Sequence, residues 1–451
     1  MNDSSLTIIE PASTRPHPMR IVFSTWWPLA ASWLMMGLEL PAVSAVIARL
    51  ADPEIHLAAY GGIVFPLALL VESPIIMLLA ASTALSRDWD AYRRLRQFMF
   101  RAALSLTVLH LVIVLSPLYD FIVGHLLHSP PEIRGPARIG LLIMTPWTAS
   151  IAFRRFQQGV LIRFHRAKWV GAGTMVRLLA NLCVLGAGLW IRDIPGIIVG
   201  ATAVAAGVVA EAIFAAFSVR PVLRHLMPER RPEEPPLSWR KLFHFYVPLA
   251  LTPLMSLLVL PILSAGMGRM PRALESLATL PALSGLIFVL RSLALAYNEV
   301  VVALFERPEL KAALMTFTRV LTVVLTLLLS LLALTPLGDV WFRHISGLPP
   351  SLASLGAVGL VIAIALPGLG VFQSWYQGIL VAIHRTRGIS EAVGIALIGV
   401  GITIVAGIFL GTIPGLWVGM IAQLVGNLLQ TLWLKWRCQK ALAWVTDSHP
   451  G

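Results

Sequence analysis

The chain has 451 residues, of which 57% are hydrophobic and only 13% are charged, a balance that excludes an ordinary soluble domain. Its formal charge is +13, but the basic residues are scattered among short loops, which argues against a nucleic-acid partner. The only two cysteines, Cys183 and Cys438, can build neither a disulfide framework nor a metal cluster, so no metal or other cofactor is expected.

The N-terminal segment, residues 1–22, is predicted to lie in the cytoplasm. It contains Pro11, Pro16 and Pro18 among polar neighbours. It lacks the basic start, the short apolar stretch and the small-residue cleavage site of a signal peptide. The first apolar run is therefore expected to stay in the protein as a membrane anchor.

Apolar runs of about 20 residues or more recur along the chain, and each is long enough to cross a bilayer core of about 30 Å. Charged clusters or Pro and Gly residues separate them. The predicted fold class is an all-α polytopic membrane protein with twelve transmembrane helices. The spans are expected near residues 24–48, 57–86, 98–118, 137–162, 169–191, 195–219, 242–267, 275–304, 313–337, 351–383, 388–411 and 413–434.

The loops between these spans alternate in their content of Lys and Arg. The segments on one side hold 24 basic residues, and the loops on the other side hold seven. Because cytoplasmic loops carry an excess of basic residues, both termini are predicted to be cytoplasmic. An odd number of spans would destroy this alternation, so twelve spans in the cell (inner) membrane are favoured.

An internal repeat relates the two halves of the chain. One ungapped offset of 219 residues superimposes five sequence marks, and six spans per repeat would orient both halves alike, around an axis along the membrane normal. The matches are Pro117-Leu118-Tyr119-Asp120 with Pro336-Leu337-Gly338-Asp339, Pro130-Pro131 with Pro349-Pro350, Gln158-Gly159-Val160-Leu161 with Gln377-Gly378-Ile379-Leu380, His165-Arg166 with His384-Arg385, and Ile194-Pro195-Gly196 with Ile413-Pro414-Gly415.

This parallel pseudo-two-fold repeat predicts two six-helix bundles, residues 23–220 and 241–436. The charged, Pro-rich stretch of residues 221–240 is interpreted as a cytoplasmic linker, and residues 437–451 as a cytoplasmic tail. Two bundles joined by one linker can rock against each other. A cleft between them is where transporters of this design hold substrate.

Three acidic residues in the predicted spans are candidates for ion coupling. Glu39 lies near the middle of the first span, Glu72 near the centre of the second and Glu299 in the eighth. A carboxyl group at membrane depth can take up a proton and release it when water enters. The alternative for Glu39 and Glu72 is a neutral, hydrogen-bonded acid that holds two helices together.

Polar stripes that include arginine mark the candidate substrate site. In the fourth span, Thr145, Thr148, Arg155 and Gln158 share one helical face. Arginine binds carboxylate and phosphate through a planar fork and keeps its charge, so a cleft that holds several arginines is suited to an anion. The predicted substrate-binding residues are Arg155, Gln158, Arg177, Asn181, Arg291, Asn298, Ser374 and Gln377.

Other polar residues at membrane depth have simpler interpretations. Arg154 and Arg177 are within about 14 Å of the cytoplasmic interface by helix rise and could snorkel to it, an interpretation that is favoured for Arg154. Hydrogen bonds between packed helices are expected for Glu211, Gln423, Asn427 and Gln430.

Several short segments carry a resemblance to a known family. They are Trp26-Trp27-Pro28-Leu29-Ala30, Ala59-Tyr60-Gly61, Gly159 six residues before His165, and Tyr297-Asn298-Glu299. With the six-plus-six architecture, they resemble the progressive ankylosis family of the multidrug/oligosaccharidyl-lipid/polysaccharide exporter superfamily, which includes the multidrug and toxin extrusion (MATE) transporters. The resemblance implies alternating access and small polyvalent anions as cargo. Where that family carries a Glu-Gln pair in the first span, this sequence has Glu39-Leu40-Pro41.

The function predicted is secondary active export of a small anionic solute, organic or phosphate-bearing, coupled to a proton or another cation. The expected partners are membrane lipids, this solute and the coupling ion. The alternatives are a flippase for a lipid-linked or polysaccharide precursor and a multidrug extrusion protein. An enzyme, such as a membrane-embedded transferase, is disfavoured because the sequence lacks G-x-x-x-x-G-K-[ST], H-E-x-x-H and G-x-S-x-G.

Overall fold

The computed structural model describes residues 17–229 and 236–448, with side chains up to residue 441. This part of the chain consists of helices, turns and loops, without a strand, which confirms the predicted all-α class. Three pieces of the predicted segments lie outside the described residues. They are 1–16 of the N-terminal segment, 230–235 of the linker and 449–451 of the tail.

The helices follow the predicted spans, with breaks inside several of them. The first half contains α1 (Pro18–Gly37), α2 (Glu39–Ile47), α3 (Pro53–Ala59), η1 (Tyr60–Val64), α4 (Phe65–Glu72), η2 (Ser73–Ile75), α5 (Leu78–Leu85), α6 (Trp89–Leu115), α7 (Leu118–Asp120), η3 (Phe121–Leu126), α8 (Pro131–Ile143), α9 (Thr145–Arg163), α10 (Lys168–Ile191) and α11 (Gly196–His225). The second half contains α12 (Trp239–Leu257), α13 (Val259–Met267), α14 (Ala273–Leu304), η4 (Pro308–Leu310), α15 (Lys311–Leu334), α16 (Leu337–Asp339), η5 (Val340–Ile345), α17 (Pro350–Ile362), α18 (Leu366–Ala382), α19 (Arg387–Leu410) and α20 (Gly415–Ser448).

In the described part of the chain, ten helical segments are long and apolar enough to cross a membrane, or eleven when the bent pair α17 and α18 counts as one span. The remaining predicted span corresponds to α8 and α9. In α9 the pairs Arg154-Arg155 and Gln157-Gln158 interrupt the apolar sequence, which explains why this span falls short on composition. The structure is therefore consistent with about twelve membrane-crossing segments.

The backbone conformation repeats between the two halves. Eight described residues have a positive φ, six of them other than glycine, and such residues are uncommon. All eight form pairs that are 219 or 220 positions apart: Asp52 with Arg272, His128 with Gly347, His165 with His384, and Arg192 with Gly411. The predicted internal repeat is thus present in the fold as well as in the sequence.

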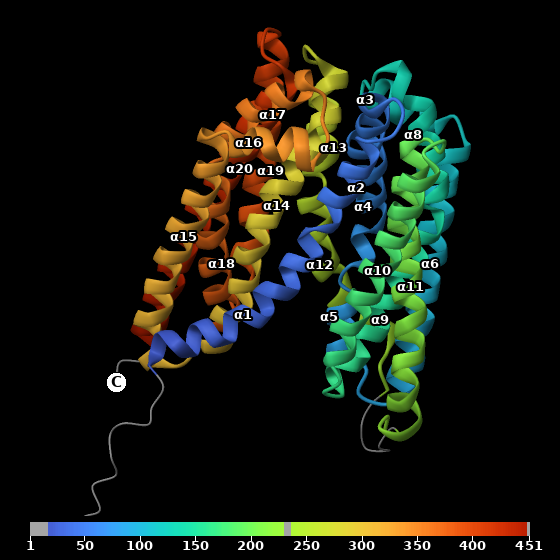
Figure 1. Ribbon diagram of the computed structural model, residues 1–451. Helices are drawn as coiled ribbons and strands as arrows, with labels where there is room; N and C mark the ends of the chain where they lie inside the picture. The colour runs from blue at the N-terminus through green and yellow to red at the C-terminus, as the bar shows by residue number, and fades with distance from the viewer. Residues whose placement is uncertain (1–16, 230–235, 449–451) are drawn as a thin grey trace, which may run out of the picture.

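Two groups of helices stand side by side and diverge toward the lower end of Figure 1, where α1 begins and α20 ends. Most second-half helices, coloured yellow to red, lie on the left, and most first-half helices lie on the right. Helix α1 crosses between the groups and packs against α14 and α15. Helix α12 makes the reciprocal crossing, because it packs against α4 and η2 as well as α19.

Both crossing helices are broken at repeat-related positions. Helix α1 ends just before Leu38, and helix α12 ends just before Leu258. Three residues after each break lies a proline, Pro41 or Pro261, which has no backbone N–H to complete the hydrogen-bond ladder. These prolines account for the bends that let each helix start against the opposite bundle.

Hydrogen bonds from aromatic side chains fix the crossing helices in place. On α1, the Nε1 of Trp26 donates to the Leu293 carbonyl oxygen (3.0 Å), and the Nε1 of Trp33 donates to Glu299 Oε1 (3.0 Å). On α12, the Tyr246 hydroxyl donates to the Pro74 carbonyl oxygen at 2.5 Å. The predicted coupling residue Glu299 therefore accepts a bond from the crossing helix α1.

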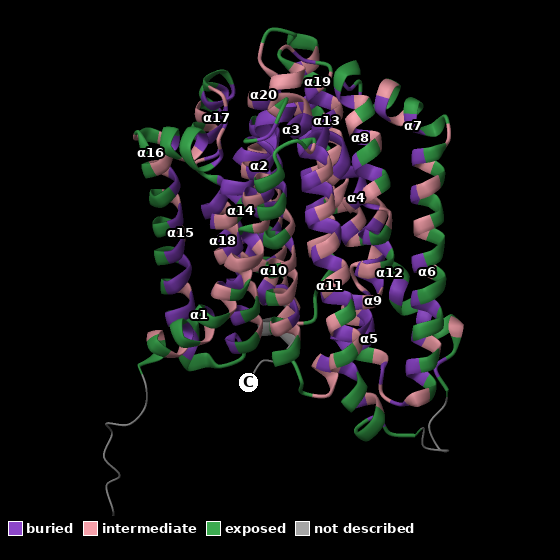
Figure 2. Cartoon of the chain, turned by 45° about the vertical axis from the view of Figure 1, so that its right-hand side comes forward, coloured by how far each residue is buried: buried purple, intermediate pink, exposed green. Residues whose placement is uncertain are grey.

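The exposed surface of the helices is strongly apolar. Figure 2 shows buried residues between the helices and exposed residues on their outer faces. Trp190 and Phe409, which are 219 positions apart, are 89% and 87% exposed. Such side chains would be costly in water but suit a hydrocarbon solvent, as expected for membrane-spanning helices.

Two repeat-related arginines connect the bundles at the upper end. Arg49 Nη2, just after α2, donates to the His344 carbonyl oxygen (2.6 Å), and Arg269 Nη2, just after α13, donates to the His125 carbonyl oxygen (3.1 Å). The bundles also approach closely here, because a Cβ on Gly268 would lie only 2.5 Å from the Leu127 carbonyl oxygen. We call Arg49 and Arg269 the upper arginine pair.

Removing the upper arginine pair is expected to favour separation of the bundles at this end. In the Arg49→Ala/Arg269→Ala variant, each bundle loses a charge-assisted bond to the other, so a separated state should gain population by about fivefold or more. Spin labels on Glu132→Cys and Ser351→Cys, exposed at the upper ends of α8 and α17, report this separation in a Cys183→Ser/Cys438→Ser background. A distance distribution identical to that of an Arg343→Ala control would contradict the prediction, because the carboxylate that pairs with Arg343 among the described residues is Asp339 of its own bundle.

Candidate functional site

A cavity of about 430 Å³ lies where the helices of the two halves meet. Helices α2, α4, α9 and α10 line it from the first half, and α12, α13, α14 and α20 line it from the second. Its lining contains four arginines and only two carboxylates, along with apolar side chains. The charged residues are Glu39, Glu72, Arg154, Arg155, Arg177 and Arg291.

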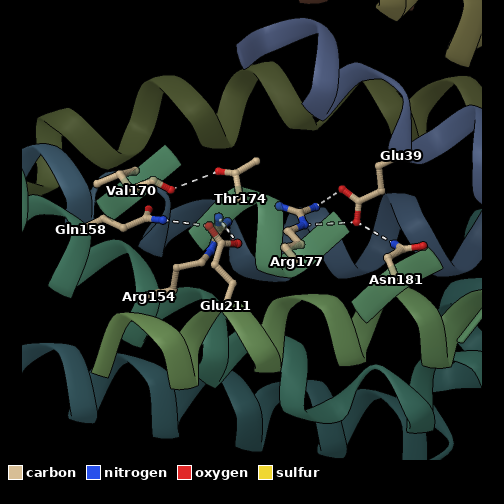
Figure 3. A network of polar contacts seen from close by, with 8 residues as sticks. All are labelled: Glu39, Arg154, Gln158, Val170, Thr174, Arg177, Asn181 and Glu211. Carbon is tan, nitrogen blue, oxygen red and sulfur yellow. Dashed lines mark hydrogen bonds and ion pairs between the residues drawn. The ribbon is translucent and has the colours of Figure 1, made fainter. Parts of the chain in front are cut away.

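The carboxylate of Glu39 is held by two residues of α10. Glu39 is the first residue of α2, directly after the break at Leu38. Arg177 forms an ion pair with it through Nη2, and its Nε donates to Oε1 at 3.2 Å. The Asn181 amide donates to the same oxygen at 3.0 Å, one helical turn further along α10. Figure 3 shows these three side chains converging from two elements.

A second ion pair is buried between α9 and α11. Arg154 Nη1 donates to Glu211 Oε2 at 2.7 Å, and Gln158 Nε2 donates to Glu211 Oε1 at 2.9 Å (Figure 3). Arg154 is 4% exposed and Glu211 is fully buried. The interpretation that Arg154 snorkels to the interface is therefore wrong, because its charge is satisfied internally. Glu211 does join two packed helices, as expected, and it does so through an ion pair as well as a hydrogen bond.

The third acid of this region, Glu72, ends α4 just before Pro74 interrupts the helix. It is 4% exposed, and its carboxyl group accepts a hydrogen bond from the Nε1 of Trp147 on α9. No described basic side chain forms an ion pair with it. Glu72 is thus a hydrogen-bonded acid that joins two helices and still faces the cavity.

Arg155 and Arg291 are the cavity arginines that lack a carboxylate partner among the described residues. Arg155, on α9, makes no hydrogen bond to the described protein, and its Nε is buried. Arg291, on α14 of the second half, donates through Nη2 to the neutral amide oxygen Oε1 of Gln373 at 3.2 Å. One unneutralised guanidinium from each half therefore faces the same cavity.

Gln373 is a site residue that the sequence analysis missed. Its Nε2 lies within hydrogen-bond distance of the Asn427 carbonyl oxygen (3.0 Å), Asn427 Oδ1 (3.1 Å) and Thr431 Oγ1 (3.3 Å). The internal repeat could have identified it, because Gln373 lies 219 positions after Arg154 and Gln430 lies 219 positions after Glu211. At this position the second bundle thus has a neutral amide in place of the charged Arg154.

The eleven predicted site residues divide into two groups. Five line the cavity: Glu39, Glu72, Arg155, Arg177 and Arg291. The other six are Gln158, Asn181, Asn298, Glu299, Ser374 and Gln377, which are not among the lining residues. Gln158 and Asn181 support the cavity from behind through Glu211 and Glu39, whereas the Asn298 amide donates to the Ser374 carbonyl oxygen at 3.1 Å.

Ion pairs neutralise part of the positive charge of the cavity. Arg154 pairs with Glu211, and Arg177 pairs with Glu39, so two of the four cavity arginines are neutralised. A guanidinium in a low-dielectric site needs a counter-charge or a set of hydrogen-bond acceptors. The remaining two arginines, Arg155 and Arg291, give the cavity an excess of positive charge over the single carboxyl group of Glu72.

Two helical bundles related by a parallel repeat thus meet at a central charged cavity. Comparison with solved structures shows that MATE-type membrane proteins share this fold. An inward-facing multidrug resistance transporter of the MATE family, in the MOP superfamily, matches with a TM-score of 0.66 and 14% identity over 92% of this chain and 99% of its own.

Two further solved structures share the fold. The lipid II flippase MurJ, in an inward closed conformation, matches with a TM-score of 0.62 and 14% identity over 90% of this chain and 87% of its own. A variant of the MATE transporter VcmN of Vibrio cholerae matches with a TM-score of 0.59 and 18% identity over 96% of this chain and 98% of its own. No protein-family model and no curated protein sequence matches the chain.

The predicted resemblance to the exporter superfamily is therefore confirmed at the level of the fold. The chain is a multi-pass α-helical protein with the MATE-type arrangement of helices. The closer likeness to the progressive ankylosis family stays a prediction.

Proposed function

We propose that the protein is a secondary active transporter that exports a small anionic solute, organic or phosphate-bearing, by alternating access. The observation that carries this proposal is the pair of unneutralised arginines, Arg155 and Arg291, which face one cavity from different halves of the chain. An anion bound to both would contact both bundles at once. Its affinity would then depend on how the bundles are arranged, which is the requirement for alternating access.

Coupling to a proton is proposed to run through Glu39. Its carboxylate neutralises Arg177 and lies at the break between α1 and α2, so a change in its charge would act on both the cavity and the hinge. Glu72 and Glu299 are the further coupling candidates. Glu72 faces the cavity, and Glu299 accepts a hydrogen bond from Trp33 of the crossing helix α1.

The end of the molecule that holds the start of α1 and the end of α20 is proposed to face the cytoplasm of a cell (inner) membrane. Of the 31 Lys and Arg residues assigned to one side of the membrane or the other, 24 belong to segments on this side. Basic loops of this kind are retained in the cytoplasm during insertion.

The transport proposal is tested by flux of candidate anions in proteoliposomes, with and without an imposed proton gradient. The wild-type protein should move at least one organic or phosphate-bearing anion, and the gradient should accelerate it. Glu39→Gln, which cannot ionise, should reduce the gradient-driven rate to the gradient-free rate. Glu132→Gln, an exposed acid in the first turn of α8, serves as the control.

Two results would contradict these assignments separately. If no anion in the screen moves, anion transport is refuted. If an anion moves and Glu39→Gln keeps full gradient stimulation, the solute class stands and Glu39 is not the coupling residue.

A flippase for a lipid-linked anion is a second candidate, and one observation favours it. An apolar pocket of about 310 Å³ lies beside the charged cavity, lined by Leu70 and Val71 of α4 and by Pro261 and Ile262 of α13. Helices α4 and α13 also line the charged cavity, so they separate an apolar chamber from a cationic one. Flux of a short-chain phosphate ester, compared with that of its water-soluble headgroup, distinguishes the two candidates.

A further inference from the structure

A separate pocket of about 400 Å³ lies at the lower end of the molecule, between α6 of the first half and the start of α12. It does not belong to the central cavity, since the two share no lining residue. Its lining residues are Phe98, Arg101, Ala102, Ser105, Trp239 and Phe243.

Two arginines of α6 stack on one tryptophan at this pocket. Arg94 and Arg101 are seven residues apart, so they lie on one face of the helix. Their guanidinium carbons lie 5.4 Å and 5.0 Å from the Trp239 ring centroid. Neither forms an ion pair with a described carboxylate. Stacking on the indole orients each guanidinium and leaves its N–H groups free to donate to an acceptor.

The pocket lies at the depth of a membrane surface. Arg101 is about 18 Å along α6 from Trp89, by helix rise, and close to the predicted start of the third span at residue 98. On the outer face of α6, Phe100 and Leu104 lie before and after Arg101, and they are 54% and 67% exposed. On α12, Val247 is 50% exposed. A cationic pocket is thus followed directly by apolar surface on two neighbouring helices.

We propose that this pocket binds the phosphate headgroup of an anionic phospholipid, whose acyl chains lie along the exposed apolar faces of α6 and α12. The phosphate supplies the acceptors that Arg94 and Arg101 lack, and a hydroxyl such as that of Ser105 can add a hydrogen bond. A free phosphate ion would use the arginines but not the adjoining apolar surface. Because α12 belongs to the second half but starts against the first bundle, a bound lipid would hold this crossing helix to α6.

Lipid retention by the purified protein tests this site independently of transport. Native mass spectrometry after titration with phosphatidylglycerol or phosphatidylcholine should show preferential binding of the anionic lipid to the wild-type protein. Arg94→Gln/Arg101→Gln should weaken phosphatidylglycerol binding by roughly 30-fold, because each cation near the surface contributes about fivefold to attraction of an anionic lipid.

The matched control is Arg220→Gln/Arg224→Gln, which removes the same charge from the last turns of α11. An equal loss of binding in the control would show a general effect of charge and overturn the proposal. Equal binding of phosphatidylcholine to the wild-type protein would also overturn it. So would displacement of the lipid by millimolar inorganic phosphate, since that would identify a free-anion site.

If the double variant is not monodisperse, Trp239→Leu and Arg101→Lys test the same site. Trp239→Leu keeps both charges and removes the stacking surface, and Arg101→Lys keeps the charge and removes the planar fork. Each should weaken phosphatidylglycerol binding several-fold. Wild-type affinity in both would refute the assigned geometry.

Discussion

Substitution of Arg155 by alanine is expected to raise the Kd or KM of the transported anion by about 10- to 100-fold, the range for loss of hydrogen bonds to a charged group. Arg155 makes no hydrogen bond to the described protein, so its removal should cost little stability while removing a major contact to the anion. Arg291→Ala should act similarly from the other bundle, with a smaller effect because Arg291 also donates to Gln373. Anion binding by calorimetry and flux in proteoliposomes measure both effects.

The control for this prediction is Arg166→Ala, which removes an exposed arginine at the end of α9 and outside the cavity. Arg155→Lys adds a chemical test, because lysine keeps the charge without the fork that binds two oxygens. It should recover part of the lost affinity for a carboxylate or phosphate. If both alanine variants bind and transport every tested anion as the wild type does, the proposed anion site is refuted.

The second large effect is expected on stability, from Glu211→Ala. This change leaves the guanidinium of Arg154 buried without its counter-charge, and the amide of Gln158 without its acceptor. Removing one partner of a buried ion pair costs about 3–5 kcal/mol. The purified variant should therefore unfold at a lower temperature or denaturant concentration than the wild type, as followed by intrinsic fluorescence in detergent.

Two variants separate this effect from a general loss of charge. Glu391→Ala removes an acid that pairs with Arg437 in a partly exposed position, where the cost should be about 1 kcal/mol or less. Arg154→Met/Glu211→Leu replaces the whole pair by apolar side chains of similar size and should recover most of the lost stability. A Glu211→Ala variant that is as stable as Glu391→Ala would show that the pair does not hold α9 to α11.

The two bundles differ in the charged residues that they place at the cavity. In the first bundle a buried ion pair, Arg154 with Glu211, supports the cavity wall. In the second bundle the neutral Gln373 occupies the position equivalent to Arg154 and joins Asn427 to Arg291. The first bundle therefore carries five of the six charged residues that line the cavity, including both acids. The second contributes Arg291 on an otherwise neutral wall.

Much of the fold could be predicted from the sequence. Spans follow from the length of apolar runs, because a helix is the simplest way to satisfy every backbone group inside a membrane. The repeat follows from a constant offset, and the positive-φ pairs confirm it in the backbone. Five of the predicted site residues face one cavity, because a charged residue at membrane depth must face a partner or a hydrated space.

The sequence could not show which charged and polar side chains pair with each other. Helical periodicity places Arg154, Arg155 and Gln158 on nearby faces of α9, but it does not say which face meets α11 and which meets the cavity. Glu39 and Arg177 are 138 residues apart, and Arg154 and Glu211 are 57 apart. Only the packing of helices decides such pairs. Gln158 therefore donates a hydrogen bond to Glu211 and does not line the cavity.

The amino-acid sequence by itself determined a polytopic helical protein, its duplicated halves and the presence of charge at membrane depth, because these depend on local hydrophobicity and on spacing along one chain. The tertiary structure alone decided that α1 and α12 cross to the opposite bundles, and that Arg49 and Arg269 join the bundles at the upper end. It also decided that Arg155 and Arg291 face one cavity without a carboxylate partner in the described part of the chain. These features arise from contacts between residues far apart in the chain, whose energies depend on how bent helices pack and not on the sequence of any one helix.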